Sequence, residues 1–326
     1  MFFLSFFVST IFLIGVGIGK YELFPHDQLK YVKDVVSGKL KAEAKAKKEA
    51  VVKAKAKKQA AQAKAIAEGL RIFDYEIVKK RFRVVKFDSA KEVIDCPPMS
   101  ESLGVLVTFG QSNSANSASH LFSSSELPDV VNWYDGKCYK ASSPLLGASG
   151  IEGEWMSQTA QFLVQNGTYT KVIVLSLGIG SSPVAAWAKG SGLNSRLLEN
   201  LRAITNLYSI TDMLWHQGEA DLIWQVGTHQ YQHSFSSMID SIREIGVYAP
   251  VFISVASVCS LRSYPNEITR AQNNLPSLSD GVVLGVNTDY LITPTMRSDS
   301  CHFNKVGQVT AAKEASNIIS AYHQSN

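Results

Sequence analysis

From Leu70 onward, short apolar runs alternate with longer stretches that mix apolar and charged residues. Runs of this length, rich in β-branched residues, are typical of strands buried on both faces of a sheet. Five occur: Leu103–Phe109, Val172–Leu177, Thr211–Trp215, Val251–Val258 and Val282–Val286. The stretches between them have helical spacing and predict helices at Met156–Gln165, Ser195–Tyr208, Thr228–Ile245, Glu267–Leu275 and Lys305–Tyr322. This alternation predicts an α/β fold, a three-layer α/β/α sandwich around a five-stranded parallel sheet.

A continuous apolar run opens the chain. Phe2–Gly19 carries no charge, and 18 residues of helix rise about 27 Å, close to the ~30 Å hydrocarbon core of a bilayer. A cleaved signal peptide would have a shorter run of about 7–15 residues, a basic start and a small-residue cleavage site. We therefore predict a transmembrane anchor over residues 1–19, with a cleaved signal sequence as the alternative.

An alanine- and lysine-rich segment follows the apolar run. Leu40–Ala67 favours a helix, because Ala and Lys are strong helix formers. It lacks both an apolar stripe to pack on a core and the apolar heptads of a coiled coil. We predict a helical spacer over residues 20–69, whose lysines could contact anionic lipid. Residues 70–99 are then a linker into a domain over 100–326.

Charge divides unevenly along the chain. The 326 residues are 45% hydrophobic and 18% charged, which excludes a disordered protein. Residues 1–68 hold 13 lysines and 6 acidic residues, a net charge of +7, whereas the remainder has a net charge of −3. The domain therefore has no basic character that would indicate nucleic-acid binding.

The four cysteines bear on the compartment. They show neither CxxC nor Cys/His metal spacing, so no zinc site is predicted. Two disulfides would fit an oxidising compartment, and four buried thiols are the alternative. Lysines after the apolar run would instead place the domain in the cytoplasm. We expect an extracytoplasmic (periplasmic) domain, with its orientation open.

Chemically useful side chains follow the first three predicted strands. Those strands run into Gly110–Asn113, Gly178–Ser182 and His216–Asp221, and Asp299–Asn304 follows the last strand. Because ligands in open α/β sheets bind beyond the carboxyl ends of the strands, these segments should meet at one sheet edge.

The segments GQSN, GSSP–W, WHQGEAD and DSCHFN resemble the successive blocks of the SGNH (GDSL-like) hydrolase superfamily. The first and third are most similar to its sialate O-acetylesterase-like branch, carbohydrate esterase family 6. The resemblance covers about residues 100–322 and implies a flavodoxin-like sheet. It also implies a serine esterase that removes O-acetyl groups from a carbohydrate.

The resemblance implies a Ser-His-Asp mechanism. Ser112 would be the nucleophile, His302 the general base and Asp299 the acid that orients it. Ser112 could alternatively be a helix N-cap, and Glu219 could support His302 in place of Asp299. The oxyanion donors would be the N–H groups of Ser112 and Gly180 and the side-chain amide of Gln217, where the superfamily usually has Asn. Gly178 could replace Gly180.

Further roles follow from the same resemblance. Trp187 and Trp215 could contact a sugar or an acyl group, although buried packing is the more common role of tryptophan. The strand order of the family would allow a Cys259–Cys301 disulfide that pins the loop of Asp299 and His302. Cys96 and Cys138 would then pair.

No phosphate loop, metal loop or nicotinamide fingerprint is present, so no cofactor or metal is expected. The main functional hypothesis is hydrolysis of a carbohydrate O-acetyl ester. An O-acetyltransferase acting on a cell-envelope glycan and a non-catalytic glycan-binding module are the alternatives.

Overall fold

The computed structural model describes residues 37–38, 41–42, 44–54, 56–57, 84–259 and 264–325. The chain divides into two compact units, Met1–Ala65 and Ile66–Asn326. In the first, the described residues are helical and exposed. The predicted anchor, residues 1–19, lies outside the described residues. Among the residues that are described, no helix combines the length and the apolar character that a membrane span needs.

The second unit is built on an eight-stranded sheet in the order β1-β4-β3-β5-β2-β6-β7-β8. All five predicted strands are present and lie side by side in parallel. The predicted number of strands was too small, because β3 adds a sixth parallel strand and β4 and β1 extend the sheet in antiparallel fashion. The bounds are β1 Val93–Ile94, β2 Leu103–Gly110, β3 Val130–Tyr134, β4 Lys137–Lys140, β5 Lys171–Ser176, β6 Asp212–His216, β7 Val251–Val255 and β8 Val282–Asn287.

The predicted linker is partly wrong. Its described part, residues 84–99, belongs to the sheet domain, because β1 pairs with β4 and a disulfide joins Cys96 to Cys138. The N–H of Val85 also donates to the carbonyl of Ala148. A strand of two residues leaves too short a pattern to be seen in the sequence.

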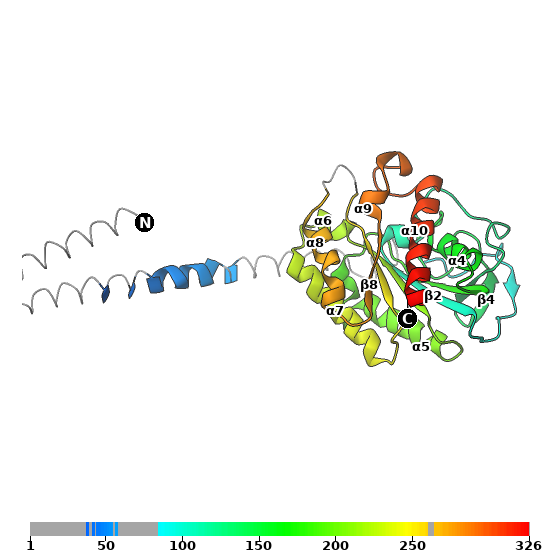
Figure 1. Cartoon of the computed structure of the whole chain (residues 1–326), viewed down its shortest axis with the longest axis horizontal. Helices are drawn as coiled ribbons and strands as arrows, with labels where there is room; N and C mark the ends of the chain where they lie inside the picture. The colour runs from blue at the N-terminus through cyan, green and yellow to red at the C-terminus, as the bar shows by residue number, and fades with distance from the viewer. Residues whose placement is uncertain are drawn as a thin grey trace, which may run out of the picture. The chain divides into compact units, whose positions relative to one another are not determined.

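Helices cover both faces of the sheet, which confirms the three layers (Figure 1). Val105, Val107 and Phe109 of β2 share one core with α5, α7 and α8, while Leu106 faces the opposite core under α4 and α10. This division follows from the alternation of side chains along a strand. The helices are α4 Met156–Gln165, α5 Gly192–Thr205, α6 Glu219–Ile223, α7 Thr228–Glu244, α8 Glu267–Asn273, α9 Thr288–Leu291 and α10 Lys305–Ser325, with short 3-10 helices η1 Ser112–Ser114, η2 Val184–Trp187, η3 Leu275–Ser277 and η4 Pro294–Met296.

A buried carboxylate ties the end of α10 to the start of β6. Asp212 is fully buried, and its two oxygens lie 2.8 Å from Nε2 of His323 and 2.6 Å from the hydroxyl of Tyr169. The hydrogen bond with Asp212 raises the pKa of His323 above its ordinary value of 6.5, although partial burial opposes the shift. This end of the sheet is opposite the edge where the motif segments lie.

Replacement of His323 by glutamine is therefore expected to change how stability depends on pH. The folded-state pKa of His323 is raised, so its contribution is fully present below pH 6.5 and is lost as the pH rises through the raised value. Because the side chain is 33% exposed, we expect no more than about 1 kcal/mol. Urea unfolding at about pH 5.5 and about pH 8.5 gives the free energy of unfolding at each pH. The difference between the two values should be smaller in His323→Gln than in the wild type. An unchanged difference would show that the pair does not titrate with folding.

Candidate active site

The three strand ends that carry the motif segments are neighbours in the sheet. Gly110 at the end of β2 pairs with His216 at the end of β6, and Thr108 pairs with Ser176 at the end of β5. The N–H of Ile179 donates to the carbonyl of Gly110 at 2.9 Å. The structure thus confirms that these segments meet at one sheet edge.

Gly110 allows the tight turn that presents Ser112. Its φ is +130°, and a Cβ atom there would lie 2.1 Å from the carbonyl oxygen of His216. A side chain at this position is therefore excluded. Ser112 begins η1 with 8% exposure. The first N–H groups of a helix have no partner within that helix. Because Ser112 is the first residue of η1, the helix does not use its N–H and leaves it for a ligand.

Asp299 and His302 form a hydrogen-bonded pair. Oδ2 of Asp299 lies 2.8 Å from Nδ1 of His302, and Oδ1 accepts the backbone N–H groups of Cys301 and His302 at 2.7 and 2.6 Å. Partial burial opposes ionisation of Asp299, but the bonds from His302 and Cys301 outweigh it and lower the carboxyl pKa. An ionised Asp299 holds the proton on Nδ1 and leaves Nε2 of the imidazole as the acceptor.

Ser112 and His302 are brought to the same site through their chain neighbours. Among the described residues, the imidazole of His302 bonds to Asp299 and makes no hydrogen bond to the Ser112 hydroxyl. Instead, Asn113 donates to the carbonyl of Cys301 at 3.3 Å and accepts the N–H of Phe303 at 3.3 Å. Catalytic hydrogen bonds are often long in a ligand-free enzyme and tighten only with substrate bound.

Glu219 contacts a different partner from the one considered in the sequence. Its side chain is 2% exposed, and Oε1 accepts the amide of Asn113 at 3.0 Å. Nδ1 of His216 lies 3.9 Å from the same oxygen. The carboxylate that bonds to His302 is that of Asp299, whereas Glu219 bonds to Asn113. The structure therefore favours Asp299 over Glu219 as the acid that orients His302.

The predicted oxyanion donors differ in their availability. The Gly180 N–H donates to Oγ of Ser149 at 2.8 Å. The fully buried amide nitrogen of Gln217 faces Oε1 of Gln111, the carbonyl of Ser182 and the carboxylate of Asp221. Gln217 was predicted to donate to the oxyanion, but the N–H groups of its amide already bond within the protein.

The carboxylate of Asp221 sits deep in this edge. Burial raises the pKa of Asp221 to about 7 against the opposing bonds from Val184 and Gln217. It accepts the N–H of Val184 at 2.9 Å and so holds the start of η2.

Gly178 lies too close to the end of η1 to carry a side chain, because a Cβ atom there would lie 2.4 Å from the carbonyl oxygen of Ser114.

The two tryptophans considered as substrate contacts are core residues. Trp187 and Trp215 are both fully buried, with ring centroids 5.6 Å apart, and both pack against Phe109. The Trp187 indole N–H donates to Ser182 at 2.9 Å. This packing favours the core role that the sequence also allowed, because large aromatic rings stabilise a core when they are buried.

The loop of His302 is tied covalently to the segment that follows β7. Disulfides join Cys259 to Cys301 and Cys96 to Cys138, which confirms both pairings. Asp289 of α9 accepts the N–H groups of Ser257 and Val258, both at 2.7 Å, just before Cys259. Burial raises the pKa of Asp289 to about 6, although these bonds oppose it. Two disulfides are typical of proteins in an oxidising compartment.

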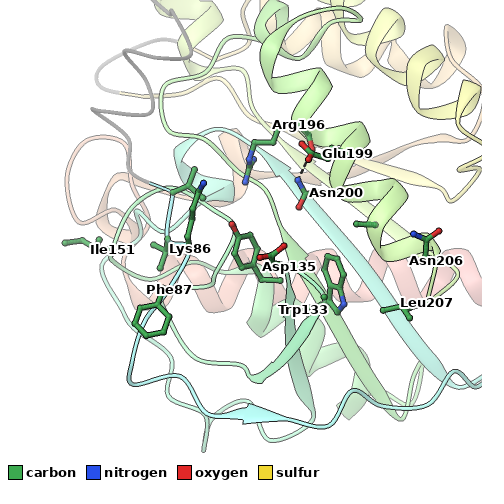
Figure 2. A pocket seen from close by; sticks show the side chains of 15 residues that line it. Lys86, Phe87, Trp133, Asp135, Ile151, Arg196, Glu199, Asn200, Asn206 and Leu207 are labelled. Carbon is green, nitrogen blue, oxygen red and sulfur yellow. Dashed lines mark hydrogen bonds between the residues drawn. The ribbon is translucent and has the colours of Figure 1, made fainter.

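A separate cavity of about 1100 Å³ lies beside α5 (Figure 2). Its walls come from Val84–Phe87, Trp133–Gly136, Ile151, the side of α5 from Arg196 to Ala203, and Asn206 and Leu207 just after that helix. None of these residues belongs to the motif segments, so this cavity does not define the candidate active site. Among the described residues, no group of three His, Cys, Asp or Glu side chains could hold a metal ion.

Three residues that contact the candidate site were missed in the sequence. Gln111 accepts the N–H of Ala220 at 3.0 Å and so holds the start of α6. Asn113 holds the loop of His302. Arg297 donates to the carbonyl of Cys301 and lies 5.1 Å over the ring of Phe303. Their positions inside the GQSN segment and next to the DSCHFN segment were the signals that could have identified them.

The chain is similar to known proteins in both sequence and fold. The family model described as carbohydrate esterase, sialic acid-specific acetylesterase (SASA), matches residues 103–320. A solved protein from Arabidopsis thaliana is 18% identical, with a TM-score of 0.55, and the match covers 69% of this chain and 99% of that one. NanS is 13% identical, with a TM-score of 0.50 and coverage of 71% and 100%. The TM-scores show that this chain shares its fold with both proteins.

No curated protein sequence matches the chain. The family model spans well over half of it, from the start of β2 into α10, and thus includes every segment of the candidate site. The resemblance inferred from the motifs is confirmed. The chain belongs to the family of sialic acid-specific acetylesterases and is a carbohydrate acetylesterase.

Proposed function

We propose that this carbohydrate acetylesterase works through Ser112, His302 and Asp299. The observation that carries the proposal is the 2.8 Å bond between Asp299 and Nδ1 of His302, in a loop bonded to the residue after Ser112. That bond orients the imidazole and supports the positive charge that it gains during the reaction.

Nε2 of His302 accepts the Ser112 proton as Oγ attacks the acetyl carbonyl. The tetrahedral intermediate collapses as the bond to the sugar oxygen breaks, and His302 gives that oxygen the proton. Water, deprotonated by His302, then attacks the acyl-enzyme. The bond between the acyl carbon and Oγ breaks, His302 returns the proton to Oγ, and acetate leaves.

We further propose that the N–H groups of Ser112 and Gly180 stabilise the oxyanion. For Gly180 this requires the Ser149 hydroxyl to give up or share the N–H that it accepts in the ligand-free protein. The loss of one oxyanion donor typically costs about 3–4 kcal/mol of transition-state stabilisation. For Gln217, whose amide nitrogen is bonded to Gln111 and Asp221, we propose support of this edge instead.

The substrate class that we propose first is an O-acetylated sialic acid, because the family model bears that description. Incubation of the enzyme with O-acetylated sialic acid, acetylated xylan and an acetylated cell-envelope polysaccharide tests it, with free acetate as the readout. Acetate from the first substrate alone supports the proposal, and release only from another polymer reassigns the glycan.

The same experiment separates hydrolysis from transfer. Water and a sugar hydroxyl compete for one acyl-enzyme, so an added oligosaccharide acceptor that becomes acetylated would identify a transferase. The non-catalytic alternative predicts no acetate from any ester.

We also propose an extracytoplasmic, periplasmic location with residues 1–19 as the anchor. The two disulfides support an oxidising compartment, and the charge-free apolar run supports anchoring. A C-terminal reporter that is active only outside the cytosol should be active, and a silent one would reverse the orientation.

A further inference from the structure

We propose that Asn113 is a positioning residue that holds the peptide groups on both sides of His302 against the loop of the nucleophile. Glu219 fixes the orientation of the Asn113 amide. The inference rests on the proposed roles of Ser112 and His302 and adds two residues to them.

The Asn113 amide connects the two halves of the site directly. Its side chain is fully buried, and it follows Ser112 in the chain. Nδ2 donates to the carbonyl of Cys301, and Oδ1 accepts the N–H of Phe303, each at 3.3 Å. One short side chain thus brackets His302 from the residue before it and the residue after it. A displacement of η1 would have to move the imidazole with it.

Glu219 determines which way the amide points. Oε1 of Glu219 accepts a hydrogen bond from Nδ2 of Asn113 at 3.0 Å, so the NH₂ end of the amide faces Glu219. The opposite amide orientation would place Oδ1 against two acceptors, Glu219 and the Cys301 carbonyl. It would also leave the buried N–H of Phe303 facing a donor. Glu219 thereby acts on His302 through Asn113.

Other contacts also hold the loop of His302, so the loss of Asn113 alone should have a limited effect on the position of the imidazole. Arg297 also donates to the Cys301 carbonyl, and the disulfide to Cys259 holds the same residue. Asp299 contacts His302 independently. Loss of Asn113 should therefore displace the imidazole by a small distance, and even such a displacement lowers the rate of a reaction that depends on alignment.

The first test compares Asn113→Ala with Asn132→Ala. Asn132 is a matched control, because it is a buried amide that brackets another residue, with Oδ1 accepting the N–H of Leu146 at 2.7 Å and Nδ2 donating to its carbonyl at 3.3 Å. Both variants should lower the melting temperature by a similar amount. Only Asn113→Ala should lower kcat for p-nitrophenyl acetate, by about 30-fold, with KM little changed.

Phosphorylation of Ser112 by diisopropyl fluorophosphate, in which Oγ displaces fluoride from phosphorus, provides a readout that does not depend on the choice of ester. The rate of this reaction reports activation of the hydroxyl by His302. It should fall in Asn113→Ala by about the same factor as kcat and stay near the wild-type value in Asn132→Ala.

An exchange of donor and acceptor tests the role of Glu219. Asn113→Asp keeps the acceptor for Phe303 but places two carboxylates together, so its kcat should fall below that of Asn113→Ala. In the double variant Asn113→Asp/Glu219→Gln, the new amide can donate to the new carboxylate. It should recover about tenfold of kcat relative to Asn113→Asp, since a matched pair replaces two facing acceptors.

The outcomes separate this inference from the proposed function. Wild-type protein that neither hydrolyses the ester nor reacts with diisopropyl fluorophosphate contradicts the proposed mechanism itself. Active wild-type protein, inactive Ser112→Ala and an Asn113→Ala variant with kcat equal to that of Asn132→Ala would refute the positioning role alone. A double variant no better than Asn113→Asp would remove Glu219 from it.

Discussion

Replacement of Ser112 by alanine is expected to reduce kcat/KM for acetyl-ester hydrolysis by at least about a thousandfold, or roughly 4 kcal/mol of transition-state stabilisation. The variant lacks the oxygen that forms the acyl-enzyme, so only water bound at the site could attack the ester. His302→Ala should lose a similar amount, because the serine hydroxyl is a weak nucleophile without its base.

The double variant Ser112→Ala/His302→Ala distinguishes a catalytic unit from two independent residues. Groups that act together are not additive, so the double variant should be no worse than either single one. Release of p-nitrophenol from p-nitrophenyl acetate measures all three. Ser117→Ala, a nearby serine outside the proposed mechanism, should hydrolyse the ester like the wild type. Turnover retained in Ser112→Ala would overturn the assignment of the nucleophile.

Removal of the Cys259–Cys301 disulfide is expected to lower both stability and activity, whereas removal of Cys96–Cys138 should lower stability alone. Each disulfide joins cysteines 42 residues apart. The chain-entropy model therefore assigns each the same contribution of about 4 kcal/mol to the free energy of unfolding. The difference in activity arises because Cys301 directly precedes His302, whereas Cys96 and Cys138 lie at the β1–β4 end of the sheet.

The double serine variants Cys259→Ser/Cys301→Ser and Cys96→Ser/Cys138→Ser are matched, so each controls for the other. Urea unfolding gives the two stabilities, and kcat for p-nitrophenyl acetate, measured where both variants are folded, gives the activities. We expect kcat to fall by about tenfold in the first variant only, through lost alignment of His302. Equal kcat values in the two folded variants would show that the disulfide does not position the loop.

The predicted strands were found because their environment is simple. Leu103–Phe109 and Val172–Leu177 lie in the middle of the sheet with both faces covered, so nearly every position is apolar. β3, β4 and β1 lie at one edge, where VVNWY and KCYK mix polar and apolar residues. Their strand character comes from pairing with neighbours that are distant in the chain, which local patterns do not record.

The candidate site shows the same division. The segments around Ser112 and His302 were identified from their residues, and the adjacent strand ends explain why those segments meet. The burial and bonds of Trp187, Trp215 and Gln217 do not favour the roles considered for them, because a side chain's direction depends on the packing around it. An aromatic or amide residue next to a motif has the same sequence whether it faces a ligand or the core.

The amino-acid sequence alone determined the alternation of strands and helices, the family, and the residue types that ester hydrolysis requires. These features are local or depend on order along the chain, so they are recorded in one dimension. The tertiary structure alone decided that Asp299 binds His302, that Glu219 binds Asn113, and that Asn113 spans the peptides beside His302. The contacts of Asn113 join segments that are more than a hundred residues apart in the chain. The bond to His302 could have come from either of two carboxylates. Both therefore depend on how the chain packs in three dimensions.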